Sequence, residues 1–305
     1  MIDAVDVAGF GASAVDLVYV LPAYPTPDGP LAKLPIQEHF ISSGGQIATA
    51  LAGCAALGLR AAFLGLTGND AHGERIREEL SRRGVDVSDA TIANAPQPYS
   101  VILLAEEQGE RIVLWHRDPD ARFTPDDVSR AAPAIARARL LHVDDVDVQA
   151  SLAAARSARE AGRMITTDID RVTEHTAELI RVATHPILAE HVPAKLTGEA
   201  DLVCALRKLR ALNDGPLVVT RGAQGAIALE GDTVIEAPGF LVHAVDTTGA
   251  GDVFRAGFIS ALLEGRPLAD VLRFANATAA SSCTRRGAIA GVPSRTDVEQ
   301  MLRQA

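Results

Sequence analysis

The sequence predicts an α/β protein in which helices flank a mostly parallel sheet. Segments of strand length alternate with longer helical segments over most of the 305 residues, and this rhythm is typical of a parallel sheet. Apolar residues make up 48% of the chain, which is ample for a buried core. Acidic residues follow several of the strands, at the edge where open α/β sheets bind ligands. They are Asp144, Asp145, Asp147, Asp168 and Asp170.

The first two strands lie at residues 4–9 and 16–21, and both are short and largely apolar. Between them, residues 9–14 (GFGASA) match a glycine-rich pattern that binds dinucleotides when a helix follows directly. Here the chain continues as a strand and ends in a proline-rich turn region. We therefore interpret the match as a coincidence and expect no dinucleotide site.

A helix is predicted to open within residues 42–50, where Gly44 and Gly45 allow a ligand to approach the backbone closely. A strand at residues 61–66 and a helix at residues 74–83 follow, which makes one βαβ step. The alternation continues with strands at 140–143, 164–168 and 217–220 and with a helix at 151–162.

A small sheet that stands off the main domain is predicted from a hairpin. Apolar segments flank a polar turn at residues 106–110, which is typical of two antiparallel strands. Together with the early strand around Asp16, this hairpin predicts a lid formed by about residues 13–41 and 97–117. A lid would exclude water from a reaction. A decoration at the edge of the main sheet is the alternative.

Composition excludes several classes of protein. A formal net charge of −10 argues against a nucleic-acid groove or a surface for anionic membranes, because either requires a basic stripe. None of the lysines, Lys33, Lys195 and Lys208, follows the glycine-rich stretch of a P-loop, so phosphates must be bound in another way. No segment has the features of a signal peptide or the apolar length of a membrane span, and we expect a cytoplasmic protein.

The cysteines, Cys54, Cys204 and Cys283, are far apart and odd in number. They form no Cys-x-x-Cys pair, and the histidines are scattered, so no zinc site is indicated. We expect the cysteines to be small buried hydrophobic residues in a reducing compartment.

The most informative segment is DTTGAGD at residues 246–252, directly before an apolar helix. Gly249, Ala250 and Gly251 let successive backbone N–H groups point at one spot where the helix begins, and such a turn binds anions. Asp252 lies within reach of any phosphate held there, as a base that orients and deprotonates a hydroxyl. The arrangement predicts a phosphoryl transferase. An ordinary strand-to-helix turn with capping acids is the alternative.

This string matches, residue for residue, the signature of the ribokinase (PfkB) family of carbohydrate and nucleoside kinases, which the chain resembles over nearly its whole length. The resemblance implies a single domain over residues 1–305 with a ribokinase-like three-layer α/β/α fold and a small β-sheet lid. It also implies ATP and Mg²⁺ as cofactors and a homodimer formed through the lid.

The resemblance gives each residue of the string a role. Asp252 would be the catalytic base, and residues 249–251 would form the anion hole for the γ-phosphate. Asp246 and Thr248 would help to hold a monovalent cation such as K⁺.

On the substrate side, the resemblance assigns Asp16, Gly44 and Gly45 to the sugar. Gln46 stands where relatives that take phosphorylated sugars have a basic residue, which favours a neutral sugar here. Thr49 stands where the family commonly has an asparagine that contacts the sugar hydroxyls. Because threonine is shorter and lacks the amide, the pattern of hydroxyls recognised at this point would differ.

On the nucleotide side, the resemblance assigns Thr220, Gly222 and Gly225 to a strand and turn beside ATP. Asn276 lies on a helix of small residues that would pack against the adenine. An ordinary strand-to-glycine turn and a packed alanine-rich helix are the alternatives for these two segments.

The chain departs from the family near the Mg²⁺ position. The family usually has Asn-x-x-Glu a little before a Leu-Thr-Gly sequence, here residues 196–198, and Ala189 and Val192 occupy the Asn and Glu positions. Glu190 is the acid close by and is assigned to Mg²⁺. This region and residues 283–288 look more like the sulfofructose-kinase-like branch of the family than like ribokinase itself.

The predicted function is therefore ATP-dependent phosphorylation of a hydroxyl on a small sugar or sugar derivative. A nucleoside kinase on the same fold is the first alternative, ranked lower because aromatic residues make up only 4% of the chain and give little material for stacking a base. The second alternative is a sugar-binding or nucleotide-binding regulator without turnover.

Overall fold

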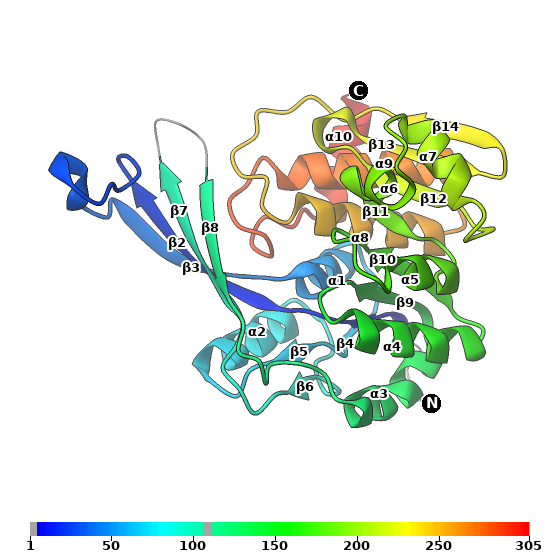
Figure 1. Cartoon of the computed structure of the whole chain (residues 1–305), viewed down its shortest axis with the longest axis horizontal. Helices are drawn as coiled ribbons and strands as arrows, with labels where there is room; N and C mark the ends of the chain where they lie inside the picture. Colours follow the sequence, from blue (N-terminus) through cyan, green and yellow to red (C-terminus); the bar gives the residue numbers. More distant parts are fainter. Residues whose placement is uncertain (1–4, 106–110, 305) are drawn as a thin grey trace.

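A parallel sheet runs through the body of the molecule (Figure 1). The computed structural model describes residues 5–105 and 111–304. Four parallel strands pair in the order β10-β9-β1-β4. Their bounds are Val5–Phe10 for β1, Ala61–Phe63 for β4, Ala138–Asp144 for β9 and Met164–Asp168 for β10.

The sheet continues beyond β10 through two isolated bridges, from Thr166 to His185 and from Ile169 to Leu188. These lead to strands in the order β11-β12-β13-β14, of which β11 and β12 are parallel and the later pairs antiparallel. Their bounds are Ile187–Ala189 for β11, Leu217–Thr220 for β12, Ala226–Glu230 for β13 and Thr233–Ala237 for β14.

Helices cover both faces of this sheet because successive strand residues point to opposite sides. Leu140 belongs to one apolar core cluster, and the next residue, Leu141, belongs to the other. The first cluster is covered by α1 (Gln46–Ala56), α2 (Ala71–Arg82), α8 (Ala250–Leu263), α9 (Leu268–Ser282) and α10 (Arg295–Arg303). The second is covered by α3 (Pro125–Arg137), α4 (Val148–Glu160), α5 (Thr176–Val182), α6 (His191–Thr197) and α7 (Leu202–Leu209). The predicted three-layer α/β/α architecture is confirmed.

A second sheet projects from the body and forms the lid (Figure 1). Its strands pair in the order β3-β2-β7-β8, with β2 and β7 parallel and both outer pairs antiparallel. Their bounds are Ala14–Leu21 for β2, Glu38–Gly44 for β3, Tyr99–Ala105 for β7 and Arg111–His116 for β8. The predicted small sheet is confirmed, while the predicted turn at residues 106–110 lies outside the described residues.

The glycine-rich segment near the N-terminus leads into a strand, as predicted. β2 follows β1 after a short link, and no helix begins there. Gly11 is a glycine because a Cβ at this position would collide with the carboxyl group of Asp144. The backbone N–H of Ala12 donates to Asp144 Oδ2 at 2.6 Å. The segment thus accommodates a buried carboxyl group of the protein itself.

The helix predicted to open within residues 42–50 begins at Gln46, and the residues before it, up to Gly44, pair with β2 as part of β3. The expectation for the cysteines needs correction. Of the cysteines, only Cys54 is fully buried; Cys204 is exposed on α7, and Cys283 is partly exposed. Over the described residues, no helix is long and apolar enough to cross a membrane.

Candidate active site

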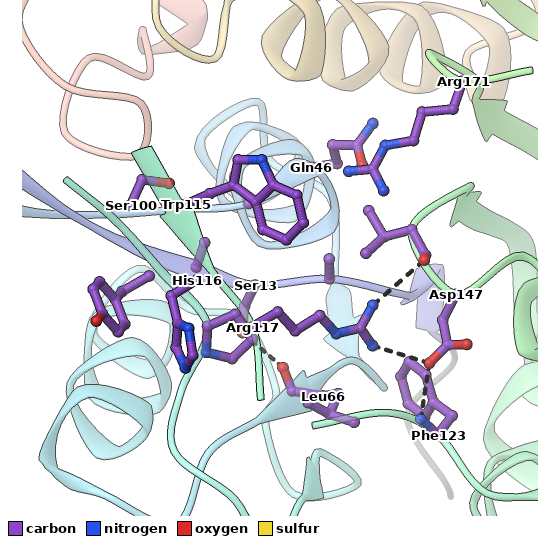
Figure 2. A pocket seen from close by; sticks show the side chains of 16 residues that line it. Ser13, Gln46, Leu66, Ser100, Trp115, His116, Arg117, Phe123, Asp147 and Arg171 are labelled. Carbon is purple, nitrogen blue, oxygen red and sulfur yellow. Dashed lines mark hydrogen bonds and ion pairs between the residues drawn. The ribbon is translucent and has the colours of Figure 1, made fainter. Parts of the chain in front are cut away.

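A cavity of about 380 Å³ lies between the lid and the body of the molecule (Figure 2). The lid supplies residues of β7 and β8, including Tyr99 and Trp115. The body supplies Gln46 from the start of α1 and Arg171 from the segment after β10. The cavity therefore opens where strands of the sheet reach their carboxyl ends, which is the usual position of a ligand site in an α/β protein.

Aromatic and cationic groups shape the lid side of this cavity (Figure 2). The side chain of Trp115 is 77% exposed, and the rings of Tyr99 and His116 have their centroids 5.4 Å apart. Arg117 is fixed in place, since its guanidinium group donates to Ala121 O at 2.7 Å and to Asp147 Oδ2 at 3.1 Å. The cavity thus offers flat apolar surface together with hydrogen-bonding groups.

The glycine pair holds the lid strand β2 close to the start of α1. Gly45 has a φ of +95°, and a Cβ at this position would stand 2.5 Å from Cα of Ser13. A Cβ on Gly44 would stand 3.1 Å from Oδ2 of Asp16, whose side chain is buried on β2. Asp16, Gly44 and Gly45 are therefore brought together as predicted, and Gly45 and Gln46 line the cavity.

Thr49 lies beside the turn at Gly249, and its contact with sugar stays a prediction. It is completely buried on α1, and its Oγ1 has no hydrogen-bond partner among the described residues. A Cβ on Gly249 would stand 3.2 Å from Cγ2 of Thr49. The residue therefore supports the glycine turn from below and is not among the residues that line the cavity.

The turn at Gly249 opens α8 without a side-chain cap. Gly249 adopts a left-handed conformation with φ +75°, and a Cβ there would stand 2.9 Å from Cβ of Ala288. The backbone N–H groups in the first turn of a helix have no partner within the helix and carry its positive end. An uncapped, glycine-lined start of this kind fits a phosphate group.

Asp252 lies in this first turn among other ionisable groups. Burial and the negative charge of Asp168 raise the pKa of the Asp252 carboxyl well above its ordinary value, while the positive charge of Arg255 acts in the opposite direction. Asp168 forms a buried ion pair with Arg255, with 2.7 Å between Oδ1 and Nη2. The Gln46 side chain also interacts with the Asp168 carboxyl. Gln46 lines the cavity, whereas Asp252 is not among the residues that line it.

The predicted nucleotide residues lie around one turn and one loop. Thr220 ends β12, and Gly222 and Gly225 bound the turn that follows. A Cβ on Gly225 would stand 2.5 Å from the nitrogen of Gly239, so this turn packs closely on the segment after β14. Asn276 on α9 holds the same segment, because its Nδ2 donates to Ala237 O at 2.9 Å. The structure thus brings Gly225 and Asn276 to one loop.

The predicted cation ligands occupy two separate places. Asp246 accepts hydrogen bonds from the backbone N–H of Thr248 and of Gly287, both at 2.8 Å, and so ties two loops together. Glu190 is exposed at the start of α6, one residue after Ala189, which pairs with Thr220 across β11 and β12. Glu190 is therefore on the same sheet edge as the predicted nucleotide turn.

A family model described as "pfkB family carbohydrate kinase" matches residues 28–295 of the chain. The chain belongs to this family. A ribokinase of Bacillus subtilis is 30% identical over 266 residues, which cover 85% of this chain and 87% of that protein. As a member of the pfkB family, the protein is a phosphotransferase that uses an alcohol group as acceptor.

Solved structures of pfkB kinases share the whole fold. A putative ribokinase from Agrobacterium tumefaciens has a TM-score of 0.88 and 29% identity, covering 99% of this chain and 98% of that chain. A ribokinase of Arabidopsis thaliana, solved with ribose and ATP, has a TM-score of 0.84, 24% identity and coverage of 99% of both chains.

Some residues of this pfkB kinase were not found by reasoning from the sequence. Arg255 is buried beside Asp252, and its signal was a charged residue within an otherwise apolar helix. Asp168 was noted only as one of several acids that follow strands. Arg171 and Trp115 line the cavity, but nothing in their local sequence distinguishes them from surface residues.

Proposed function

We propose that the protein is an ATP-dependent and Mg²⁺-dependent kinase that phosphorylates a hydroxyl group of a small sugar or sugar derivative. Asp252 takes the proton of the acceptor hydroxyl, whose oxygen forms a bond to the γ-phosphorus. The bond from the γ-phosphorus to the bridging oxygen breaks, and ADP leaves. The first-turn amides of α8 stabilise the charge on the phosphoryl group during transfer.

One observation carries this proposal. The Asp252 carboxyl group lies in the uncapped first turn of α8, on the same helix as the buried partner of Asp168, and a cavity of about 380 Å³ lies between the lid and the body. Such a cavity has the size of a small organic substrate, and it is bounded on one side by the lid. Removal of water by the lid would matter, because water is the competing phosphoryl acceptor.

The residues around the turn at Gly225 fit a nucleotide, and the uncapped start of α8 fits its phosphates. Glu190 would hold Mg²⁺, which prefers oxygen ligands and supplies positive charge beside the phosphates. Asp246 and Thr248 would contribute to a K⁺ site. Asp246 has carboxyl lone pairs beyond the two that accept backbone N–H groups, so it fits this role.

Two acceptor classes are favoured by different observations. Gln46 presents a neutral amide in the cavity, which supports a neutral sugar. The exposed indole of Trp115 supports either a sugar ring or a nucleoside, since both have a face that packs on an aromatic surface. The second candidate function is accordingly a nucleoside kinase.

The test is Mg²⁺-dependent release of ADP from ATP across a panel of ketoses, aldoses, sugar acids and nucleosides, with and without K⁺. Release stimulated by sugars supports the proposed function, and release by nucleosides alone selects the second candidate. ATP binding without turnover on any acceptor would instead support the regulator. We propose that the enzyme acts in the cytoplasm as a homodimer, which the exposed apolar side chains of β8 support.

A further inference from the structure

The buried ion pair between Asp168 and Arg255 occupies an unusual position for such a pair. Asp168 is the last residue of β10, and Arg255 lies on α8 three residues after Asp252. The two side chains are 3% and 4% exposed, with Oδ1 and Nη2 2.7 Å apart. Because removing two charges from water is costly, an ion pair this deep contributes little to stability by itself. Its place directly behind a reacting carboxyl group suggests another role.

The Arg255 side chain lies against the turn that carries Asp252. A Cβ on Gly251 would stand 2.9 Å from Nη1 of Arg255, so the guanidinium group lies directly against the backbone of the anion-binding turn. Oδ2 of Asp168 has no hydrogen-bond partner of normal geometry among the described residues. The Asp168 carboxyl interacts with that of Asp252. Each of these carboxyl groups changes the pKa of the other, and carboxyl groups that interact in this way titrate as a pair.

Charged groups from several elements surround these carboxyls. Asp144 at the end of β9 acts on Asp252, and Asp170 after β10 acts on Asp168. His142 on β9 stays neutral, because burial and the charge of Arg255 lower its pKa to about 3. Among the described residues that act on Asp252, Arg255 is therefore the cation that balances the negative charge of the carboxyl groups.

We propose that Asp168 and Arg255 are positioning residues that fix the orientation and the charge state of Asp252. This inference rests on the proposed function. Burial raises the pKa of the Asp168 carboxyl and the charge of Arg255 acts against this, while the negative charge of Asp168 raises the pKa of Asp252. The positive charge of Arg255 lowers the pKa of Asp252 in turn, so that Asp252 is ionised when the acceptor hydroxyl arrives. The two residues thus act on Asp252 in opposite directions.

The experiment follows the titration of Asp252 directly, by carbon-13 NMR of protein labelled in its aspartate carboxyl groups. The Asp252 signal is assigned by its loss in Asp252→Asn. We expect Arg255→Gln to raise the titration midpoint of Asp252 and Asp168→Asn to lower it, each by about one pH unit or more. Arg255→Lys keeps the charge and should leave the midpoint near that of the wild type. Arg273→Gln changes an exposed arginine on the neighbouring helix α9 and is the matched control.

Midpoints that stay in place, or that move in the same direction in both variants, would overturn the proposal. The titration requires no turnover, so failure to find an acceptor would count against the proposed function and leave this test intact. If a single variant does not fold, the double variant Asp168→Asn/Arg255→Gln, which leaves no unpaired charge, is judged by its kcat, because the two opposite shifts cancel in its titration midpoint. The proposal predicts that kcat of the double variant is at least about tenfold below that of the wild type, with ATP affinity unchanged. A pair that only supports the fold would leave kcat at the wild-type value.

Discussion

Asp252 experiences two opposing effects at the start of α8. The positive end of the helix and Arg255 favour its carboxylate form, while burial and the neighbouring carboxyls favour its protonated form. The second set is the stronger, so the pKa of Asp252 is raised well above the usual range. A base with a raised pKa accepts a proton from a hydroxyl more readily than an ordinary carboxylate does.

Replacement of Asp252 by Asn should lower kcat by about 10²–10⁴-fold, because the amide cannot take the proton of the acceptor. ATP binding should change little, since the backbone N–H groups of α8 remain. Steady-state kinetics and calorimetric titration with ATP measure the two effects. The matched control is Asp270→Asn, an exposed acid in the first turn of α9, which should retain full activity. Substantial turnover in the Asp252 variant would refute its role as the base.

Asp144 predicts a dependence of stability on pH. Burial raises the pKa of this carboxyl to about 7, although it accepts the N–H groups of Ala12 and Val146. When folding raises the pKa of an acid, its contribution to stability is fully present at a pH below the pKa of the unfolded state, near 3.8. This contribution is lost as the pH rises toward the pKa of the folded state, about 7. Asp144→Asn removes the titration.

We expect the free energy of unfolding of Asp144→Asn, relative to that of the wild type, to rise by about 1–3 kcal/mol between pH 5 and pH 8. Urea unfolding at the two pH values gives the free energies of unfolding. Asp232→Asn, at an exposed turn, is the control and should show no such difference. Equal effects of Asp144→Asn at both pH values would contradict the raised pKa.

At the residue scale, the sequence predicted features formed by neighbouring residues along the chain. It did not predict contacts between residues that are distant along the chain. The string at residues 246–252 is contiguous, so the turn that opens α8 could be predicted from spacing alone, and the role of Asp252 as the base stays a prediction. The pairing of Asp168 with Arg255 depends on packing between β10 and α8, and no local pattern reports it. The burial of Thr49 beside Gly249 is likewise a result of packing between α1 and the start of α8, which its local sequence does not show.

At the scale of elements, the boundary between β3 and α1 determines how the cavity is closed. The sequence predicted a helix start around the paired glycines, and α1 begins at Gln46, directly after them. It did not predict that β3 runs up to Gly44 through pairing with Ala14, because that partner is distant along the chain. Gly45 is then the one residue that turns the chain from strand to helix, with φ +95° and with Ser13 against it.

Gly45→Ala should raise KM for the sugar about tenfold and destabilise the fold by about 1–3 kcal/mol, because a Cβ would push Ser13 and the base of β2 away. The matched control is Gly58→Ala. Gly58 has the same φ of +95°, but a Cβ there meets nothing within 4 Å. Both variants carry the backbone strain, so the difference between their KM values isolates the steric effect on the cavity. Equal KM values would show that Gly45 is required for its conformation only.

At the scale of the whole molecule, the lid leaves apolar surface uncovered. The alternating pattern of the sequence predicted the layers of the body, because each strand and helix contributes to one continuous core. It did not predict the faces of β8, where Ile112, Leu114 and Trp115 are 39%, 56% and 77% exposed. Trp115 and His116 at the end of β8 line the cavity, whereas Ile112 and Leu114, farther along the strand, do not. We call the surface at Ile112 and Leu114 the outer face of the lid.

A second copy of the chain covering this outer face would form an isologous dimer. We expect the wild type to elute at twice the monomer mass of 32.0 kDa, as measured by light scattering. Leu114→Glu places a charge in the interface and should shift the protein to the monomer, with KM for the sugar raised because the lid loses its support. Leu241→Glu is the matched control, since Leu241 is fully exposed at 103% and lies outside the lid strands. A monomeric wild type, or a dimer that Leu114→Glu leaves intact, would show that the outer face of the lid is not the interface.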